Sequence, residues 1–391
     1  MSEYQYYEFR TVDRILTAKE QAEIKKLSSR VQLTSTQATF VYNYGDFRGD
    51  PEKVLTDYFD IMFYVASWST WRLMFRFPKA IADPKWFQPY ELPDSITIST
   101  TPKYTVLDVE ISDEEGLRPW TTGEGWLSRL LPLRDELLQG DLRLLYLAWL
   151  RVAPNLAGYV LEDDPVEPAI PPNLGQLSEP LKAFIEWVGL DADWVTVAAQ
   201  ASVRQRLAQS ATPKEPKTEQ PLENWLSALS EAEKQEFLLK LVRRESQVDL
   251  QLITRLQELA GVERSQPEST PGYRRLSDLG TAAQQLRTQR QRKEQDAAQE
   301  KRIRELEALA PKEAQMWQKV TELIDRKQPK YYDEATTLLK DLRDLAKHQG
   351  RLPSATAKLP VEFTERFEGL RAEYQSRRAL MTRFSKIQPQ D

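Results

Sequence analysis

The sequence contains no cysteine and a single histidine, His348, among 391 residues. Disulfide bonds are therefore excluded, and zinc sites, which draw on cysteine and histidine, have almost no ligands available. The 14 glycines form neither of the phosphate-binding patterns G-x-x-x-x-G-K-[ST] and G-x-G-x-x-G. No serine-nucleophile motif is present either. We therefore expect no catalytic residue, no metal and no cofactor.

Long hydrophobic runs are also missing, since no stretch approaches the roughly 18 apolar residues of a membrane span. The first ten residues, MSEYQYYEFR, lack the basic and then apolar pattern of a secretory signal. The 54 basic and 59 acidic residues give a net charge of −5, which excludes a strongly basic protein but not a local basic patch. These features predict a cytoplasmic protein without a membrane partner.

The N-terminal region alternates between predicted strands and helices. Residues 4–10 and 38–47 are rich in aromatic side chains, and residues 70–77 alternate between two faces, as strands do. Two further β-rich runs, 95–100 and 103–111, predict a hairpin. The order of elements indicates an α+β fold with helices on one face of an antiparallel or mixed sheet, and we expect a ferredoxin-like variant.

Helix starts in this region have clear local signals. Thr17 and Glu20 form a capping box, and Asp50 followed by Pro51 gives an N-cap with proline at the first helical position. The apolar stripe after Pro51 predicts a helix that continues to Phe63.

From Trp126 onward the pattern is mainly helical. The proline-rich stretch 162–175 and the polar stretch 210–221 are typical of linkers or irregular loops. We therefore predict three parts: an α+β domain with terminal helices at 1–160, a linker-bounded helical region at 161–262, and a charged helix with a helical hairpin at 263–391.

The last part has few aromatic residues and many charges, and Trp317 is its only tryptophan. Residues 275–310 form helices readily but have almost no apolar side chain before Ile303, which is typical of a solvent-exposed arm, a coiled coil or a frayed helix. An apolar stripe then resumes on both sides of Gln328-Pro329 and predicts two antiparallel helices.

Two sets of residues are candidates for partner contacts. The loop region of the predicted hairpin presents two tyrosines that either bind a protein partner or cap the helix pair. Its candidate residues are Lys327, Lys330, Tyr331, Tyr332, Asp333 and Arg343. The charged arm carries candidate nucleic-acid contacts at Arg287, Arg290, Arg292 and Lys293. Acidic residues interleave with them, which weakens phosphate binding.

Three weaker candidates remain. Arg72 and Arg76, beside Tyr4 and Tyr6, predict an aromatic and basic sheet face for single-stranded RNA. The densest carboxylate groups, typical of solvated acidic loops, are Glu110 with Asp113, Glu114 and Glu115, and Asp163 with Asp164. These groups are the candidates for oxygen ligands of a metal ion, but neither has the glycine and glutamate positions of a calcium loop. A hydrolase hypothesis needs two carboxylates about 5 to 9.5 Å apart in a cleft, and the sequence assigns no such pair.

Several segments resemble a family of uncharacterised bacterial proteins. The N-terminal ones are YYEFRTVDRILTAKEQAEIKKLSSR, YGDFRGDPEKVLTDYFD and LPLRDELLQGDLRLLYLAWL. Two later ones, WLSALSEAEKQEFLLKLV and KQPKYYDEATTLLKDLRDLAKHQGR, resemble segments of bacterial proteins with a SWIM zinc finger. The zinc-finger ligands are absent here, so the resemblance implies no metal. It implies a common partner or complex, which includes a SWIM zinc-finger protein as a candidate partner.

Three functions therefore compete. The first is a non-enzymatic interaction or adaptor protein, favoured by the missing catalytic motifs, the linkers and the charged arm. The second is a nucleic-acid-associated protein that binds through the basic part of the arm. The third is a carboxylate-based hydrolase.

Overall fold

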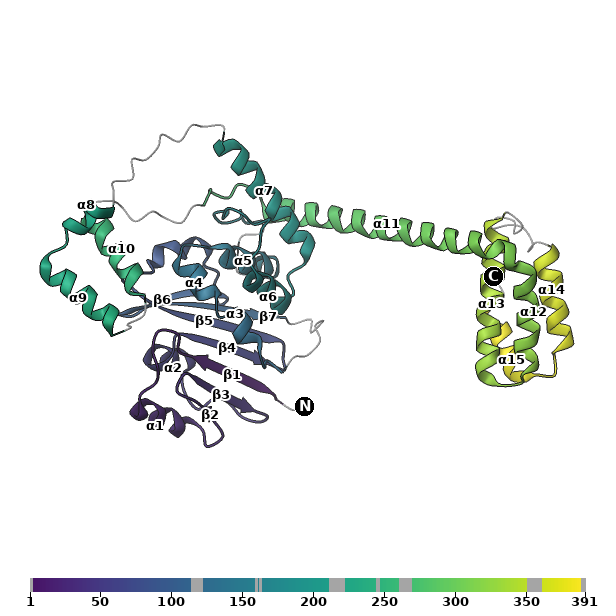
Figure 1. The fold of residues 1–391 in the computed structure, drawn as a ribbon, viewed down its shortest axis with the longest axis horizontal. Coiled ribbons are helices and arrows are strands. Elements are labelled where there is room, and N and C mark those ends of the chain that lie inside the picture. Colours follow the sequence, from purple (N-terminus) through teal and green to yellow (C-terminus); the bar gives the residue numbers. More distant parts are fainter. Residues whose placement is uncertain are drawn as a thin grey trace. The chain divides into compact units, whose positions relative to one another are not determined.

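The computed structural model describes most of the chain, namely residues 3–113, 122–158, 161, 164–210, 222–243, 247–259, 269–349 and 361–387. The chain divides into two compact units, Met1–Leu286 and Arg287–Asp391, which are described separately (Figure 1). The prediction of an α+β region followed by a mainly helical region is confirmed. The three-part division at residues 160 and 262 stays a prediction.

The first unit contains a seven-stranded sheet with the strand order β2-β3-β1-β4-β5-β7-β6. Every neighbouring pair in it is antiparallel. Its strands are β1 (Gln5–Arg10), β2 (Gln32–Leu33), β3 (Gln37–Tyr42), β4 (Ile61–Ala66), β5 (Thr70–Pro78), β6 (Ile96–Thr100) and β7 (Tyr104–Ser112). The predicted hairpin is confirmed as β6 and β7.

Two helices, α1 (Ala18–Leu27) and α2 (Pro51–Tyr58), pack on one face of this sheet through Ile24, Val54 and Leu55. Both predicted starts are confirmed. Thr17 and Glu20 make the reciprocal capping bonds of α1. The Asp50 carboxylate accepts hydrogen bonds from the backbone N–H groups of the first turn of α2, which satisfies donors that the helix leaves unpaired.

The prediction of a helix through Phe63 is wrong, because α2 ends at Tyr58 and residues 61–66 form strand β4. All six residues of β4 are buried, since β1 and β5 flank the strand and both sheet faces are covered. A strand buried on both faces has a continuous apolar run, and such a run does not show the two-residue period.

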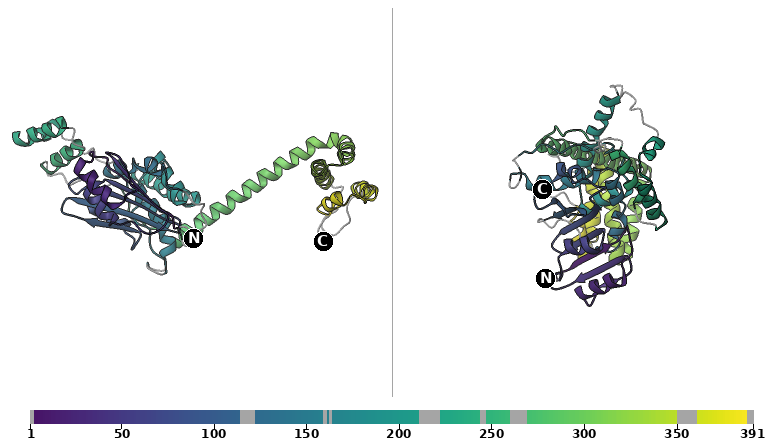
Figure 2. Two further views of the ribbon diagram at one scale, coloured as in Figure 1. Left: turned by 90° about the horizontal axis from the view of Figure 1, so that it is seen from below. Right: turned by 90° about the vertical axis from the view of Figure 1, so that its left-hand side faces the viewer.

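Helices cover the other face of the sheet and form the largest core of the unit (Figure 2). They are α3 (Trp126–Leu130), α4 (Leu133–Leu138), α5 (Arg143–Leu156), α6 (Glu179–Val188) and α7 (Ala192–Ser210). The helical pattern that follows Trp126 is divided into α3 and α4 near Pro132, whose ring has no N–H to continue a helix. Gly140, with φ at +83°, separates α4 from α5.

The proline-rich stretch is irregular, as predicted, but its described residues 164–175 are packed into the fold. Val166 pairs with Arg275 and Ile170 pairs with Thr270, so this stretch lies against the segment before α11. Gly272 is required there, because a Cβ atom would lie 1.9 Å from the Glu167 carbonyl oxygen. The predicted linker at 210–221 lies, except for Ser210, outside the described residues.

Three short helices follow, and then one long helix. They are α8 (Leu222–Ser227), α9 (Glu231–Val242), α10 (Val248–Leu259) and α11 (Leu276–Leu309). Helix α11 has 34 residues, and every residue from 288 to 301 is exposed. This run confirms the expected exposed charged helix. At about 1.5 Å per residue the helix is about 50 Å long.

The second unit is a helical bundle. Beyond the end of α11 it contains α12 (Glu313–Asp325), α13 (Pro329–His348), α14 (Val361–Glu373) and α15 (Arg378–Phe384). Short 3₁₀ turns occupy Ala310–Lys312 here, and Pro84–Trp86 and Gln88–Tyr90 in the first unit. The predicted hairpin is confirmed as α12 and α13. Sequence patterns did not predict α14 and α15, whose Phe363, Phe367 and Phe384 complete the core.

Among the described residues, no helix combines the length and the apolar character needed to cross a bilayer.

Candidate protein-docking surface

Helix α9 is the clearest candidate for a functional surface, because none of its 12 residues is buried. Four of its large apolar side chains are exposed, with fractions of 60% for Leu238, 52% for Leu239, 53% for Leu241 and 81% for Val242. Single exposed leucines are ordinary, but a cluster on one helix marks a contact surface. We call these four residues the α9 apolar face.

The α9 apolar face has the spacing of a helix-packing surface. Leu238, Leu241 and Val242 follow the three- and four-residue spacing at which helical side chains are neighbours. At about 100° of rotation per residue, these three side chains together with Leu239 span an arc of about 160° around the helix. Its neighbours α8 and α10 also expose Leu226, Ile253 and Leu259, with fractions of 41%, 44% and 37%.

Polar contacts hold the opposite side of α9. The Ser230 hydroxyl and the Glu233 carboxylate form the capping box that the sequence pattern S-x-x-E encodes. Arg255 of α10 donates to Glu233 at 2.9 Å, and Lys240 donates to Gln251 at 3.5 Å. The capping bonds to Ser230, followed by the Arg255 contact, lower the pKa of Glu233 to about 2. The helix is therefore fixed without burial of its leucines.

The predicted partner residues at the start of α13 differ in burial and in contacts. Tyr332 is 7% exposed and belongs to the bundle core, so it does not present its ring to a partner. Tyr331 packs partly against that core, and the Arg326 guanidinium lies 4.8 Å from its ring. Asp333 is paired with Arg383 at 2.6 Å.

The other predicted residues of this set are not buried. Lys327 and Lys330 are exposed. Arg343 donates to the Asp344 carboxylate at 3.0 Å and to the Ile387 carbonyl at 3.1 Å, which fixes α13 to the end of the bundle. The role of these exposed residues in partner binding stays a prediction.

The predicted nucleic-acid residues all lie on α11. Arg287, Arg290 and Lys293 recur every three residues and share one side of the helix, whereas Arg292 lies on the opposite side. Glu294 falls on the same side as Arg290. The surface therefore alternates in sign, and a phosphate backbone would contact only part of it.

The predicted RNA-binding sheet face is not formed. Tyr6 is paired with Val65, which is paired with Trp71, so Tyr6 and Trp71 share one face. Arg72, the next residue, points to the other face because side chains alternate along a strand. There it binds the Asp108 carboxylate at 2.6 Å.

One buried ionic cluster joins three elements of the first unit. Arg134 of α4 is fully buried and makes two bonds to Asp13, at 3.0 and 2.6 Å. Asp60 is 1% exposed, lies 2.5 Å from Arg76, and accepts the Val12 N–H at 2.7 Å. Burial disfavours the charged form of Asp60, but both guanidinium groups outweigh it and lower its pKa. These contacts give the cluster a structural role.

A second buried cluster fixes the segment before α11. Glu167 is 3% exposed and accepts two hydrogen bonds from Arg274, each at 2.7 Å. The Tyr146 hydroxyl of α5 also donates to Glu167, and burial raises the pKa of Tyr146. Asp60 and Glu167 are both engaged by arginine, which is typical of structural carboxylates rather than of a hydrolase pair.

The remaining predicted groups do not form a site. Asp164 caps the start of α11 at Ser277, and Asp113 lies 3.8 Å from Arg151. Glu114, Glu115 and Asp163 lie outside the described residues. His348 lies at the end of α13, 3.6 Å from Glu307. In the described part of the chain, no three potential ligands come together to hold a metal ion.

The described residues thus define an α+β sheet unit with an exposed apolar helix, and a helical bundle. No protein-family model matches the chain, and neither a curated protein nor a solved structure has significant similarity to it. The resemblance to proteins with a SWIM zinc finger stays a prediction.

Proposed function

We propose that the protein is a non-enzymatic cytoplasmic adaptor that docks an amphipathic helix of a partner protein on the α9 apolar face. The observation that supports this proposal is a helix with no buried residue and four exposed leucine or valine side chains. The lack of cysteine in the whole chain supports a reducing compartment.

The spacing of the apolar side chains on α9 favours a helix as the occupant. Apolar side chains spaced at three and four residues can interdigitate with those of a second helix, as when a helix binds in an apolar groove. The charges of α9 are largely paired within the helix, because Lys234 lies 2.7 Å from Glu231 and Lys240 lies 2.8 Å from Glu236. The apolar contact therefore dominates recognition of the partner helix.

The resemblance of WLSALSEAEKQEFLLKLV to segments of SWIM zinc-finger proteins supplies a first partner to test. We therefore propose such a protein from the same cell as the binding partner. The nucleic-acid alternative has weaker support, since the exposed cations of α11 are interleaved with carboxylates.

The test uses purified full-length protein and the purified partner, treated with nuclease. We expect the double variant Leu238→Glu, Val242→Glu to weaken binding at least about tenfold, because it places charges in an apolar contact. The matched control is Trp68→Glu, which changes a side chain of 48% exposure in the turn between β4 and β5, at the opposite end of the strands from the Asp13 contact with Gln247, and leaves binding unchanged.

Equal binding by the wild-type protein and the double variant would contradict the docking surface. Binding that disappears with nuclease would instead favour the nucleic-acid alternative.

The topology of the first four strands supports a more specific fold assignment. We propose that residues 5–66 form a ferredoxin-like motif. The support is the element order β1-α1-β2-β3-α2-β4 together with the spatial order β4-β1-β3-β2 and the packing of α1 and α2 on a single face. Strands β5, β7 and β6 then extend this motif beyond β4.

A further inference from the structure

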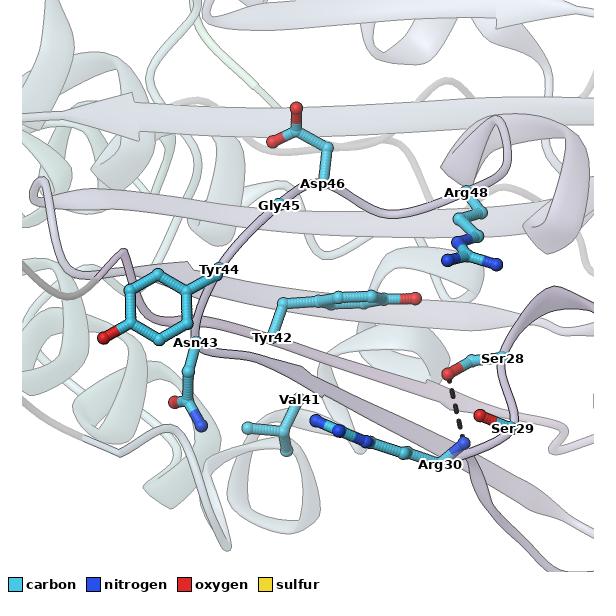
Figure 3. Close-up of a pocket in the computed structure, with 10 residues that line it drawn as sticks. All are labelled: Ser28, Ser29, Arg30, Val41, Tyr42, Asn43, Tyr44, Gly45, Asp46 and Arg48. Carbon is cyan, nitrogen blue, oxygen red and sulfur yellow. Dashed lines mark hydrogen bonds between the residues drawn. The ribbon is translucent and has the colours of Figure 1, made fainter.

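A cleft of about 640 Å³ lies beside the end of α1 and the end of β3. Its volume is within the usual range of small-molecule sites, about 300–1,000 Å³. Three segments line it, namely Ser28–Arg30, Val41–Asp46 and Arg48 (Figure 3). It lies on the first unit and does not involve the α9 apolar face.

The cleft exists because β2 is much shorter than its neighbour. The two residues of β2 pair only with Ala38 and Thr39, whereas β3 continues to Tyr42. The Thr34 N–H donates to the Gln37 carbonyl at 2.8 Å, so the antiparallel alternation directs the N–H groups of residues 37, 39 and 41 to this edge. Beyond Thr39 no strand covers that edge in the described part of the chain, and the Val41 N–H faces the cleft.

Two arginines line the cleft without a carboxylate partner. Arg30 and Arg48 are both exposed, and neither forms an ion pair with another described residue. Their neighbours on the same unit behave differently, because Arg14 binds Glu20 and Arg10 binds Glu8. Unpaired guanidinium groups in a concave site are typical of phosphate recognition.

The acidic residue in the lining does not cancel this charge. Asp46 accepts a hydrogen bond from Gln5 at 3.2 Å, and in Figure 3 its carboxylate points away from Tyr42 and Arg30. The three ionised side chains leave a net charge of +1, which favours an anionic ligand.

Tyr42 supplies an independent observation. Its hydroxyl is buried, and it has no hydrogen-bond partner among the described residues. In Figure 3 the ring extends toward the side of the cleft where Arg48 and Ser28 lie. Edge contacts with Tyr7 and Phe47 hold the ring in place. Native structures rarely leave a buried hydroxyl unsatisfied, so this group has hydrogen-bonding capacity that a polar ligand atom beside it would use.

The geometry points to a binding site for a small phosphate ester of the nucleoside monophosphate class. Arg48 holds the phosphate together with the hydroxyls of Ser28 and Tyr42, which lie on the same side of the cleft in Figure 3. Arg30, whose guanidinium lies below Val41, adds positive charge at the other end of the cleft. The ring of Tyr44, which is 78% exposed, offers a face for stacking of the base.

The experiment is calorimetric titration of the full-length protein with AMP, inorganic phosphate and adenosine. We expect one AMP site, with phosphate and adenosine each binding more weakly because each lacks half of the contacts. Arg48→Ala lowers the AMP affinity at least about tenfold, and Arg30→Ala lowers it less. Lys25→Ala, which removes an exposed cation of α1 outside the cleft, is the matched control and leaves the affinity unchanged.

Two further variants test the separate parts of the site. Tyr42→Phe lowers AMP affinity without lowering the melting temperature, because it removes an atom that has no hydrogen-bond partner among the described residues. Tyr44→Ala lowers the affinity for AMP but not for phosphate. Equal affinities for phosphate and AMP would overturn the nucleotide assignment. No AMP binding at millimolar concentration, or unchanged binding by both arginine variants, would overturn the site.

Discussion

Helices α5 and α9 are both rich in leucine, with five in 14 residues and three in 12, but their environments are opposite. Nine of the 14 residues of α5 are buried, and none of the 12 residues of α9 is. Helix α5 is apolar on all sides, from Leu144 through Leu150, so every face needs cover. Helix α9 has one apolar face, and the helix is packed through its other side. Leucine count alone therefore does not distinguish a core helix from a docking helix.

The two helices also differ in what stabilises them. Burial against the sheet and its neighbours stabilises α5, whereas a capping box and ion pairs stabilise α9. The sheet-covering helices α3–α6 behave like α5, and α4 adds the buried Arg134 cluster. Substitutions at matched positions can test this difference.

The largest effect is expected at α4. Arg134→Ala leaves Asp13 and Asp60 with one guanidinium fewer in a buried site, and it should lower the free energy of unfolding by about 3–5 kcal/mol. Urea denaturation measures this change. The control Arg129→Ala removes an exposed pair with Glu186 and should cost at most about 1 kcal/mol. Equal losses of unfolding free energy in both variants would show that the buried cluster stabilises the fold no more than an exposed ion pair does.

A leucine pair compares α5 and α9 directly. Leu145 of α5 is fully buried, so Leu145→Ala should lower the free energy of unfolding by about 2–5 kcal/mol through a lost contact and a cavity. Leu241 of α9 is 53% exposed, and Leu241→Ala should change it by about 0.5 kcal/mol or less. A loss above about 1 kcal/mol at Leu241 would mean that α9 is packed in solution.

The smallest effect is expected from acid. The folded-state pKa of Glu233 is lowered to about 2, so its stabilising contacts are present above the ordinary glutamate value and are lost as the pH falls toward 2. Amide protection measured by NMR should therefore decrease in α9 between pH 5 and pH 2.5 while α5 keeps its protection. In Glu233→Gln the protection of α9 should no longer depend on pH in this range. A parallel loss in both helices would contradict this assignment.

Local signals in the sequence predicted much of the fold. The capping boxes at Thr17 and Ser230 and the two-face alternation of residues 70–77 are all present. Each depends on residues within a few positions of one another. The strand at 61–66 was missed because its apolar run lacks a period, and no pattern showed that Tyr332 faces a core completed by α14 and α15.

The buried clusters and the cleft could not be predicted, because their members are distant in sequence. Arg134 and Asp13 are separated by 121 positions, and Arg274 and Glu167 by 107. The cleft depends on the length of β2, which ends its pairing after two residues. A strand predicted from sequence does not show over how many of its residues the neighbouring strand will pair with it.

The central place of β1 has a consequence for synthesis. Residues 5–10 are synthesised before residues 37–42 and 61–66, which form the strands that flank β1 on both sides. The pairing of β1 with β4 cannot form until residues 61–66 have been synthesised. Until then one hydrogen-bonding edge of β1 stays unpaired, and side chains that are buried in the folded protein, such as Phe9, lack part of their cover. Deletion of β1 would leave β2-β3 separated from the remaining four strands, which makes the N-terminal segment a poor place for truncation.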